Sequence, residues 1–322
     1  MAIKICGTGS CLPKHCVTND DLSKIMDTSD EWIRSRTGIE SRHLVTDETT
    51  TFLSVEAARA AMQEAEIEPE EVELILAATI SPDYVIPTLA CEVQRELGAV
   101  HAVAFDVGAA CSGFLFALNT AYAYLKSGQY KNALVIGAET LSKMMDWEDR
   151  STCVLFGDGA GAAVLKDVPG EEGILSLVQG SDGARGMVLS CGGREIHNPY
   201  VKTERKLSYV QMNGQEVYKF AVRTVPLAIS DAVEKAEIAL DQVDYFVLHQ
   251  ANIRIIESVA KRLHQPMKKF PSNLQKCGNI SAASVPILLD EMNRKGMLKK
   301  GNTIVLAGFG GGLTWGAAVL TW

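Results

Sequence analysis

The chain has 322 residues, of which 47% are hydrophobic, and a formal net charge of −8 at pH 7. This length and apolar content predict a globular protein of about two domains with a large core, and the acidic balance argues against general binding to nucleic acid, whose phosphates would repel it. No uncharged apolar run approaches the roughly 18 residues that a membrane span needs, and residues 1–12 lack an apolar signal segment, so we expect a soluble, cytoplasmic protein with no membrane partner.

Predicted strands alternate with amphipathic helices along most of the chain. Apolar runs predict strands at 73–78, 102–107, 133–137, 245–248 and 303–307. Alternation of this kind is typical of α/β folds, here with mixed, mostly parallel sheets. The segment 182–208 is polar and has no periodicity, so we expect a long excursion over the surface.

The segment around Cys111 joins a predicted strand to a predicted helix. Residues 103–107 form the strand, three small residues follow it, and apolar residues recur at helical spacing from Phe114. Unpaired amides and the positive dipole at a helix N-terminus favour a thiolate and lower a cysteine pKa from about 8.5, and the same amides can hold an oxyanion. A nucleophile beside an anion site suggests acyl transfer; the alternative is a small cysteine that fills a tight corner of the core.

Two internal matches indicate a duplication. Gly-Ala-Ala-Val-Leu at 161–165 recurs at 316–320, each time after a glycine-rich turn, and Ala-Glu-Ile at 65–67 recurs at 236–238, each time before a predicted strand. Because the matches come in the same order and context, they predict two βαβ-type halves. We place the halves at residues 1–170 and 171–322, with the boundary in a turn-rich stretch.

The second half supplies three possible partners for Cys111. His249 lies at the exit of a predicted strand, where α/β proteins bind ligands, and Asn279 comes just before a predicted helix. The glycines of 308–312 offer backbone amides for an anion. Each feature has an ordinary structural explanation as a core histidine, a helix cap or a turn, but together with Cys111 they favour a catalytic site. Eight scattered cysteines without a CxxC pair predict reduced thiols and no metal site.

Six segments together resemble the β-ketoacyl-[acyl-carrier-protein] synthase III family of the thiolase-like superfamily, along essentially the whole chain. In order, they are 30–39 (Asp-Glu-Trp-Ile-Arg-Ser-Arg-Thr-Gly-Ile), 106–113 (Asp-Val-Gly-Ala-Ala-Cys-Ser-Gly), 156–160 (Phe-Gly-Asp-Gly-Ala), 249–252 (His-Gln-Ala-Asn), 278–284 (Gly-Asn-Ile-Ser-Ala-Ala-Ser) and 310–316 (Gly-Gly-Gly-Leu-Thr-Trp-Gly). The resemblance implies a thiolase-like fold of two duplicated α/β halves in an αβαβα layering. It also implies a catalytic triad of Cys111, His249 and Asn279.

Relatives of this family differ from the chain at two places. Thiolases have a second cysteine in the C-terminal glycine-rich segment, whereas no cysteine follows Cys277 here. Chain-elongating synthases have a histidine where this chain has Asn279.

The resemblance implies the initiating condensation of type II fatty acid synthesis. An acyl group passes from acyl-CoA to Cys111, while the amides of Cys111 and Gly311 hold the oxyanion. Malonyl-[acyl-carrier-protein] then loses carbon dioxide, as His249 and Asn279 each donate a hydrogen bond to its thioester oxygen. The carbanion attacks the acyl-cysteine and gives 3-oxoacyl-[acyl-carrier-protein]. Decarboxylation supplies the driving force, so no metal or redox cofactor is needed.

The resemblance also implies binding roles in a homodimer. Residues expected to bind CoA are Trp32, Arg36, Arg150 and Asn252. Residues expected at the acyl pocket are Phe156, Phe309 and Ile86, the last contributed by the partner subunit. Residues expected to meet an acidic carrier protein are Gln250, Arg254 and Lys261, of which the two cations lie seven apart on one predicted helix face.

Three other interpretations use the same residues. A homologue could make a secondary metabolite by the same chemistry. A cysteine hydrolase also pairs cysteine with histidine and asparagine, and it would hydrolyse thioesters without condensation. A non-catalytic acyl-CoA-binding protein would bind the same ligand without a covalent adduct.

Overall fold

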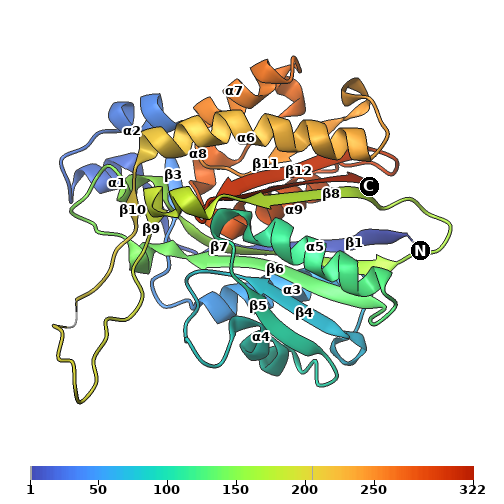
Figure 1. Cartoon of the computed structure of the whole chain (residues 1–322), viewed down its shortest axis with the longest axis horizontal. Helices are drawn as coiled ribbons and strands as arrows, with labels where there is room; N and C mark the ends of the chain where they lie inside the picture. The colour runs from blue at the N-terminus through green and yellow to red at the C-terminus, as the bar shows by residue number, and fades with distance from the viewer. Residues whose placement is uncertain (1, 205) are drawn as a thin grey trace.

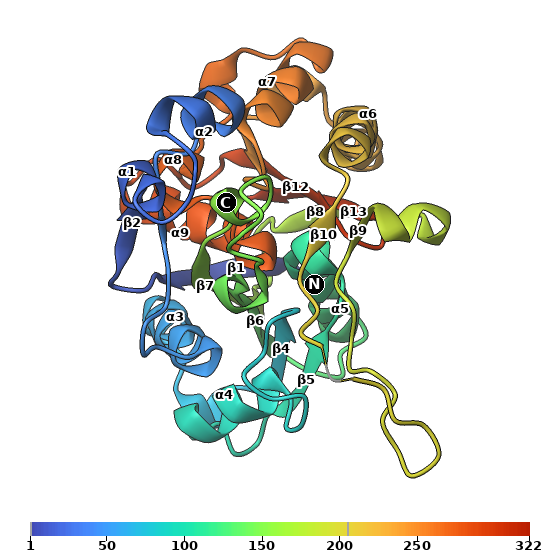
Figure 2. The same cartoon turned by 90° about the vertical axis from the view of Figure 1, so that its left-hand side faces the viewer.

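The computed structural model describes residues 2–204 and 206–322, and the chain forms two β-sheets that alternate with three layers of helices (Figure 1). The turned view in Figure 2 separates these layers and places one pair of helices between the two sheets. The layered αβαβα arrangement expected from the sequence is confirmed. In the part of the chain that is described, no helix is both long and apolar enough to cross a membrane.

The first sheet has the strand order β1-β7-β6-β4-β5. Its strands are β1 (Ile3–Cys11), β4 (Leu74–Ala78), β5 (Val103–Val107), β6 (Asn132–Thr140) and β7 (Asp158–Asp167). All five residues of β4 are buried, because the strand lies inside the sheet and helices cover both of its faces. Its sequence therefore runs apolar without alternation.

The second sheet has the order β11-β12-β13-β8. Its strands are β8 (Ile174–Ser181), β11 (Tyr245–Leu248), β12 (Thr303–Gly310) and β13 (Thr314–Thr321). The five predicted strands are all present, and β11 has the predicted bounds. Both main sheets draw on separate stretches of chain, 3–167 and 174–321.

The sheets are mixed, as expected, but antiparallel neighbours outnumber parallel ones. Strand β4 is parallel to β5 and β6, and β11 is parallel to β12, whereas the remaining four neighbours are antiparallel. The two repeated segments, 161–165 and 316–320, lie in β7 and β13. Each of these strands returns directly beside the strand before it, with no crossover helix. The alternation of strands and helices in the sequence did not reveal that β7 and β13 pair antiparallel with the strands that precede them.

The helices fall into three layers. The central layer holds α5 (Gly113–Lys126) and α9 (Ser284–Arg294). One outer layer holds α3 (Thr50–Glu64) and α4 (Leu89–Leu97), and the other holds α6 (Gly214–Lys235) and α7 (Ile253–Arg262). Apolar residues of α5 and α9 pack with those of both sheets in one continuous core cluster.

Both central helices begin with the same local structure. A 3-10 turn, η2 (Ala110–Ser112), precedes α5, and another, η8 (Ser281–Ala283), precedes α9. Each turn opens with a residue in the left-handed region, Ala110 at φ 44° and Ser281 at φ 45°. The two turns contact each other between the sheets, so the residues they carry meet at one point.

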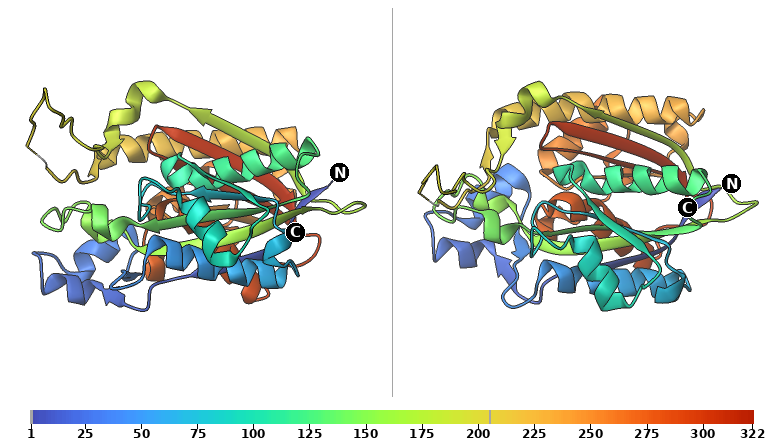
Figure 3. Two further views of the ribbon diagram at one scale, coloured as in Figure 1. Left: turned by 90° about the horizontal axis from the view of Figure 1, so that it is seen from below. Right: turned by 60° about the horizontal axis from the view of Figure 1, so that its bottom comes forward.

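The predicted surface excursion divides into two parts. The first contains η5 (Gly183–Val188) and β9 (Leu189–Ser190), which pairs with β10 (Gln211–Met212). The second, 191–204 with 206–209, projects from the body of the molecule, as Figure 3 shows. The remaining elements are β2 (Cys16–Thr18), α1 (Asn19–Ser23), α2 (Asp30–Thr37), β3 (Ser41–His43), η1 (Pro69–Glu71), η3 (Leu141–Met144), η4 (Cys153–Leu155), η6 (Leu240–Gln242), η7 (Met267–Lys269) and α8 (Leu274–Cys277).

Candidate active site

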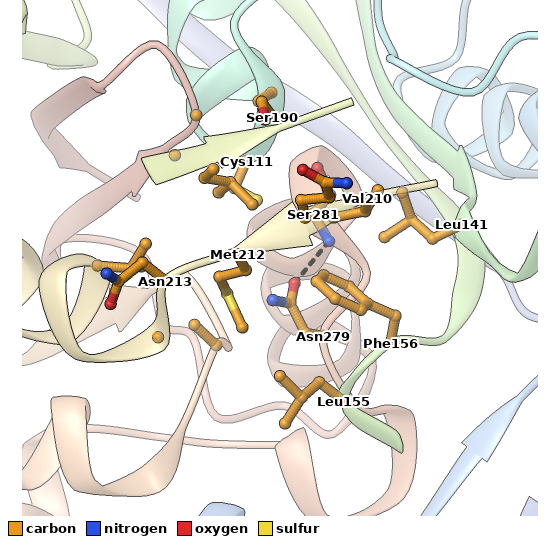
Figure 4. Close-up of a pocket in the computed structure, with 18 of the residues that line it drawn as sticks. Cys111, Leu141, Leu155, Phe156, Ser190, Val210, Met212, Asn213, Asn279 and Ser281 are labelled. Carbon is orange, nitrogen blue, oxygen red and sulfur yellow. Dashed lines mark hydrogen bonds between the residues drawn. The ribbon is translucent and has the colours of Figure 1, made fainter. Parts of the chain in front are cut away.

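A pocket of about 1790 Å³ lies where the ends of both sheets meet the central helices. Cys111, His249 and Asn279 all line it, and it extends to Trp32 and Arg36 on α2. Figure 4 shows Cys111 and Asn279 with apolar neighbours that include Leu141, Phe156 and Met212. The structure thus brings Cys111 together with His249 and Asn279, which both lie more than a hundred positions further along the sequence.

Cys111 is held in place by two turns of the chain. Strand β5 ends at Val107, and the left-handed Ala110 turns the backbone so that Cys111 lies two residues before α5. The β12–β13 turn packs closely against it, since a Cβ on Gly310 would lie 2.6 Å from the Cys111 nitrogen. Only glycine fits at that position. Thr314 also joins the turns, because its Oγ1 donates to the Ala109 carbonyl at 3.2 Å.

The ionisation of Cys111 differs from the expectation. Burial raises the pKa of the Cys111 thiol to about 12, and the charge of Glu139 adds to that rise, whereas the Ser281 hydroxyl lowers it. The expectation of a lowered pKa considered only the helix N-terminus. Desolvation of the thiolate outweighs that effect, although Cys111 is partly exposed to the pocket. The thiol proton must therefore be removed as the sulfur reacts.

His249 follows β11 and is fixed by its backbone. Its N–H donates to the Ala307 carbonyl at 2.8 Å, which extends the pairing of β11 with β12. The side chain is 3% exposed and packs edge-on against Phe309, with ring centroids 5.5 Å apart. Burial lowers the pKa of His249 from 6.5 to about 3. The imidazole is therefore neutral near pH 7 and offers one N–H donor.

Three hydrogen bonds hold Asn279 in place. Its backbone N–H donates to the Leu155 carbonyl at 2.9 Å, and its carbonyl accepts from the Gly157 N–H at 3.0 Å. Its side-chain Oδ1 accepts from the backbone N–H of Ser281 at 2.8 Å, the dashed bond in Figure 4. Because the side-chain oxygen is occupied, the side chain presents its Nδ2 donor to the pocket.

The candidate oxyanion donors come from the two turns just described. Gly311 lies in the β12–β13 turn, and a Cβ on it would meet the Ala110 Cβ at 3.5 Å. The backbones of Gly311 and Cys111 therefore run side by side at one wall of the pocket, and both residues line it.

The mouth of the pocket carries an aromatic ring between two cations. The guanidinium of Arg36 lies 4.6 Å from the Trp32 ring centroid, and that of Arg150 lies 5.2 Å from it. Arg150 also bonds the Asp27 carboxylate at 3.0 Å. The Asn252 side chain is engaged by protein groups, since its Nδ2 donates to the Arg36 carbonyl at 3.0 Å and its Oδ1 caps α7. Asn252 thus joins α7 to α2 at the mouth.

The other predicted site residues divide into three groups. Phe156 and Phe309 are buried and line the pocket. Ile86 does not lie among the lining residues of this chain's pocket and is 85% exposed. Arg254 and Lys261 are exposed on α7, and Arg254 also donates to the Ser35 carbonyl at 2.7 Å.

Gln250 requires a correction. It is 1% exposed, its Nε2 donates to the Leu248 carbonyl at 2.7 Å, and its Oε1 accepts from Ser272 Oγ at 2.7 Å. A side chain buried in this way and already bonded at both ends cannot contact a carrier protein. The residue instead fixes the backbone beside His249. Its position next to a motif histidine in the sequence gave no sign of which way it points.

Two polar residues near Cys111 were missed from the sequence. Ser281 lines the pocket, and Glu139 is fully buried at the end of β6. Ser281 was interpreted only as part of a family segment, and Glu139 lies two residues beyond the predicted strand 133–137. An acidic residue just beyond such a strand was the available signal for Glu139.

The fold and the pocket define a class of protein, a thiolase-like enzyme with a cysteine, a histidine and an asparagine in one pocket. Family models agree with this class: "3-Oxoacyl-[acyl-carrier-protein (ACP)] synthase III" matches residues 105–183, and "3-Oxoacyl-[acyl-carrier-protein (ACP)] synthase III C terminal" matches residues 233–322. The curated beta-ketoacyl-[acyl-carrier-protein] synthase III of Clostridium acetobutylicum is 51% identical, over 100% of this chain and 99% of that protein.

Solved structures give the same result. The 3-oxoacyl-[acyl-carrier-protein] synthase III of Aquifex aeolicus VF5 superposes with a TM-score of 0.93 at 45% identity and covers 100% of both chains. The synthase of Thermus thermophilus also has a TM-score of 0.93, at 40% identity and 99% of both chains. The chain therefore belongs to the β-ketoacyl-[acyl-carrier-protein] synthase III family of acyl-transferring condensing enzymes.

Proposed function

We propose that this protein starts fatty acid synthesis by joining an acyl group from acyl-CoA to malonyl-[acyl-carrier-protein]. The convergence of Cys111, a neutral His249 and the Nδ2 donor of Asn279 in one pocket carries this proposal. A cysteine hydrolase would need its histidine to accept a proton. A histidine whose pKa burial lowers to about 3 is suited to donate a hydrogen bond instead.

In the first step, the Cys111 sulfur attacks the thioester carbon of acyl-CoA. The backbone amides of Cys111 and Gly311 hold the oxyanion, the bond from that carbon to the CoA sulfur breaks, and CoA leaves. Preorganised donors of this kind contribute a few kcal/mol each to transition-state stabilisation. The turn contacts of Gly310 with Cys111 support this pairing, since they bring the two amide-bearing backbones together.

In the second step, malonyl-carrier protein loses carbon dioxide. Negative charge then develops on its thioester oxygen, where the N–H of His249 and the Nδ2 of Asn279 each donate a hydrogen bond. The carbanion attacks the acyl carbon on Cys111, and the Cys111 sulfur leaves. Donors held by fixed backbone bonds, as at Asn279, need no reorganisation as this charge forms.

At the mouth, Trp32 stacks on the adenine of CoA, while Arg36 and Arg150 meet its phosphates, because guanidinium groups match phosphate geometry. Asn252 contributes by holding α2 against α7, the two helices between which CoA enters.

The carrier protein docks beside this mouth through basic residues. Arg254 and Lys261 on α7 are exposed, and a groove between η5 and α6 adds Arg185, Lys219 and Arg223. In this groove Lys219 is paired with Glu216 and Arg185 with Asp182, each at 2.8 Å. Acidic partners are drawn to such patches by long-range attraction, which acts on the association rate. The net charge of −8 makes this basic rim a local exception on an acidic protein.

The functional unit is a homodimer formed along β5. This strand is the edge of the first sheet, and exposed apolar residues surround it: Val103 is 46% exposed, Tyr84 58%, Val85 69% and Ile86 85%. An apolar edge strand is a template for pairing with another chain. Pairing there would cover the loop that carries Ile86 and would let it reach the partner's acyl pocket.

Intact-protein mass spectrometry after brief exposure to acetyl-CoA, isobutyryl-CoA and longer acyl-CoAs tests the proposal. We expect an acyl adduct on the parent protein and none on Cys111→Ala. Asn279→Ala should still acquire the adduct but should lose decarboxylation of malonyl-carrier protein by about 10²-fold or more. A folded parent that takes no acyl group from any of these thioesters would refute the transfer step.

A further inference from the structure

Two buried oxygen atoms beside Cys111 have no hydrogen-bond partner among the described residues. They are Oγ of Ser281 and Oε1 of Glu139. Ser281 is 1% exposed and Glu139 is fully buried. Buried polar groups are almost always bonded, and an exception calls for a functional explanation.

Glu139 is held by only one of its two oxygens. Its Oε2 accepts from Thr79 Oγ1 at 3.3 Å, from the Ile80 N–H at 3.1 Å and from Ser81 Oγ at 2.5 Å. Three donors from the end of β4 thus fix the carboxyl group, and its other oxygen is left for something else.

Ser281 lies between Glu139 and Cys111. It begins η8, which packs on β6, the strand of Glu139, and against η2, the turn of Cys111. The Ser281 hydroxyl is close enough to lower the pKa of both groups, although its oxygen forms no hydrogen bond of good geometry to either. Its backbone N–H, in turn, holds the side chain of Asn279.

The ionisable groups that face Glu139 are few. Cys111 on η2 interacts with its charge, as does Lys143 on η3. Lys143 is itself paired with Asp83 at 3.7 Å and also interacts with Asp158. Burial raises the pKa of the Glu139 carboxyl to about 7, and bonds from Ser81, Ile80 and Thr79, together with the nearby Ser281 hydroxyl, oppose that rise.

We propose that Ser281 and Glu139 form a proton relay for Cys111. As the bond between the Cys111 sulfur and the acyl carbon forms, the thiol proton passes to Ser281 Oγ, and the hydroxyl proton of Ser281 passes to Glu139 Oε1. The bond from the acyl carbon to the CoA sulfur breaks, and water protonates the departing thiolate. When the condensation later expels the Cys111 sulfur, Glu139 returns the proton by the same route.

This assignment explains both unpartnered oxygens at once. In this relay the Ser281 hydroxyl bridges Cys111 and Glu139. Ser281 Oγ and Glu139 Oε1 each gain their missing hydrogen-bond partner during the reaction. Because the thiol has a pKa of about 12 and the carboxyl about 7, the proton does not transfer in the resting protein. It moves as the sulfur attacks, which is the behaviour of a general base. Ser281 is thus a catalytic residue, and Glu139 is a positioning residue that acts through it.

The proposal rests on Cys111 as the nucleophile, and alkylation by iodoacetamide tests it without acyl-CoA. We expect Ser281→Ala and Glu139→Gln to slow alkylation of Cys111 by about 10²-fold. In the parent, the rate should rise as pH passes through about 7, where Glu139 loses its proton. This rise in rate with pH should be absent in Glu139→Gln and should be present in part in Glu139→Asp. Cys111→Ala, which should lose the adduct, identifies the labelled site.

Two matched variants test whether the loss of any buried hydroxyl or carboxylate would slow alkylation of Cys111. Ser176→Ala removes a buried serine of β8 that donates to the Ala232 carbonyl, and Glu92→Gln neutralises a buried glutamate of α4. Both should alkylate at the parent rate. Because the Ser281 hydroxyl has no geometric partner, Ser281→Ala should unfold at the parent temperature or above it.

Parent rates and an unchanged pH profile in both Ser281→Ala and Glu139→Gln would overturn the relay. That result is distinct from failure of the proposed function. A parent that alkylates through the relay but accepts no acyl group would keep this inference and refute the acyl-transfer step.

Discussion

Gly310 packs directly against Cys111, the proposed nucleophile. A Cβ at this position would lie 2.6 Å from the Cys111 nitrogen and 3.0 Å from its Cβ. Gly310→Ala should therefore push the nucleophile from its position and lower acyl transfer by about 10²-fold, since displacements near 1 Å have effects of that size. Overpacking should also cost about 1–3 kcal/mol of stability.

Gly98→Ala gives a contrasting control, because a Cβ there meets nothing within 4 Å. Gly98 has φ 77°, so this control carries backbone strain without the clash at Cys111. It should lose stability but keep its acyl-transfer rate, as measured by adduct formation. An equal acyl-transfer rate in Gly310→Ala and the parent would show that the β12–β13 turn can shift to accommodate the added Cβ without moving Cys111.

The buried His249 should make stability depend on pH. Burial lowers its pKa from 6.5 to about 3, so between these values the unfolded chain binds a proton that the folded chain does not. The free energy of unfolding must then fall as pH drops through this window. Urea unfolding of His249→Gln should show a smaller loss of stability than the parent between about pH 6.5 and pH 4. If the parent and His249→Gln lost stability equally over this pH range, the imidazole of His249 could not be neutral and buried.

At the scale of elements, α6 and α7 form the rim at which a carrier protein is proposed to dock. Arg223 is exposed on α6 in the basic groove with Arg185 and Lys219. Arg223→Glu should raise the apparent KM for malonyl-carrier protein about tenfold and weaken the dependence of this KM on salt. It should leave adduct formation from acyl-CoA unchanged, because the acyl-transfer step does not involve the carrier protein.

Lys131→Glu is the matched control for that prediction. Lys131 is exposed just before β6, at the end of this strand opposite Glu139, and its reversal makes the same change in net charge. It should leave the KM for malonyl-carrier protein unaltered. A similar rise in this KM in both variants would mean that the overall charge of the protein, and not the α6 groove, governs binding of the carrier protein.

For the whole molecule, the sequence predicted what local patterns determine. The fold class and layering followed from strand–helix alternation and from the six family segments, and both were confirmed. The three proposed triad residues lie in one pocket because they sit at strand ends and helix entrances, which an α/β fold brings to one edge.

What was missed depends on contacts between distant segments. Strands β7 and β13 each lie between the preceding strand and a distant one, β1 or β8. The Gln250 side chain is held by Ser272, 22 positions further on. The raised pKa of Cys111 comes from burial in the folded chain, with a further rise from the charge of Glu139. The meeting of Ser281 with Glu139 joins residues 142 positions apart, and no local pattern contains it. The division at residue 170 stays a prediction, although the two main sheets lie on either side of it.

The exposed edge of β5 has a consequence for the assembly. Val103 points its side chain to solvent at the start of this strand, and the loop of Ile86 leaves β4 near the other end of β5. If two copies pair there, Val103→Asp places two carboxylates in the interface and should convert the dimer to a monomer, since buried unpaired charges cost several kcal/mol. Sedimentation or light scattering should then report half the parent mass. The acyl-chain preference should also broaden, because Ile86 of the partner no longer closes the pocket.

Leu227→Asp is the matched control, because Leu227 is a 58% exposed apolar residue on α6, away from β5. Its mass and acyl preference should equal those of the parent. Ile86→Trp offers a second, independent measurement: in a dimer it should shorten the longest acyl group accepted in mass spectrometry, whereas in a monomer the same exposed side chain would change nothing. An unchanged mass for Val103→Asp, with an unchanged chain preference for Ile86→Trp, would place the interface elsewhere and would leave the acyl pocket to be closed by this chain's own residues.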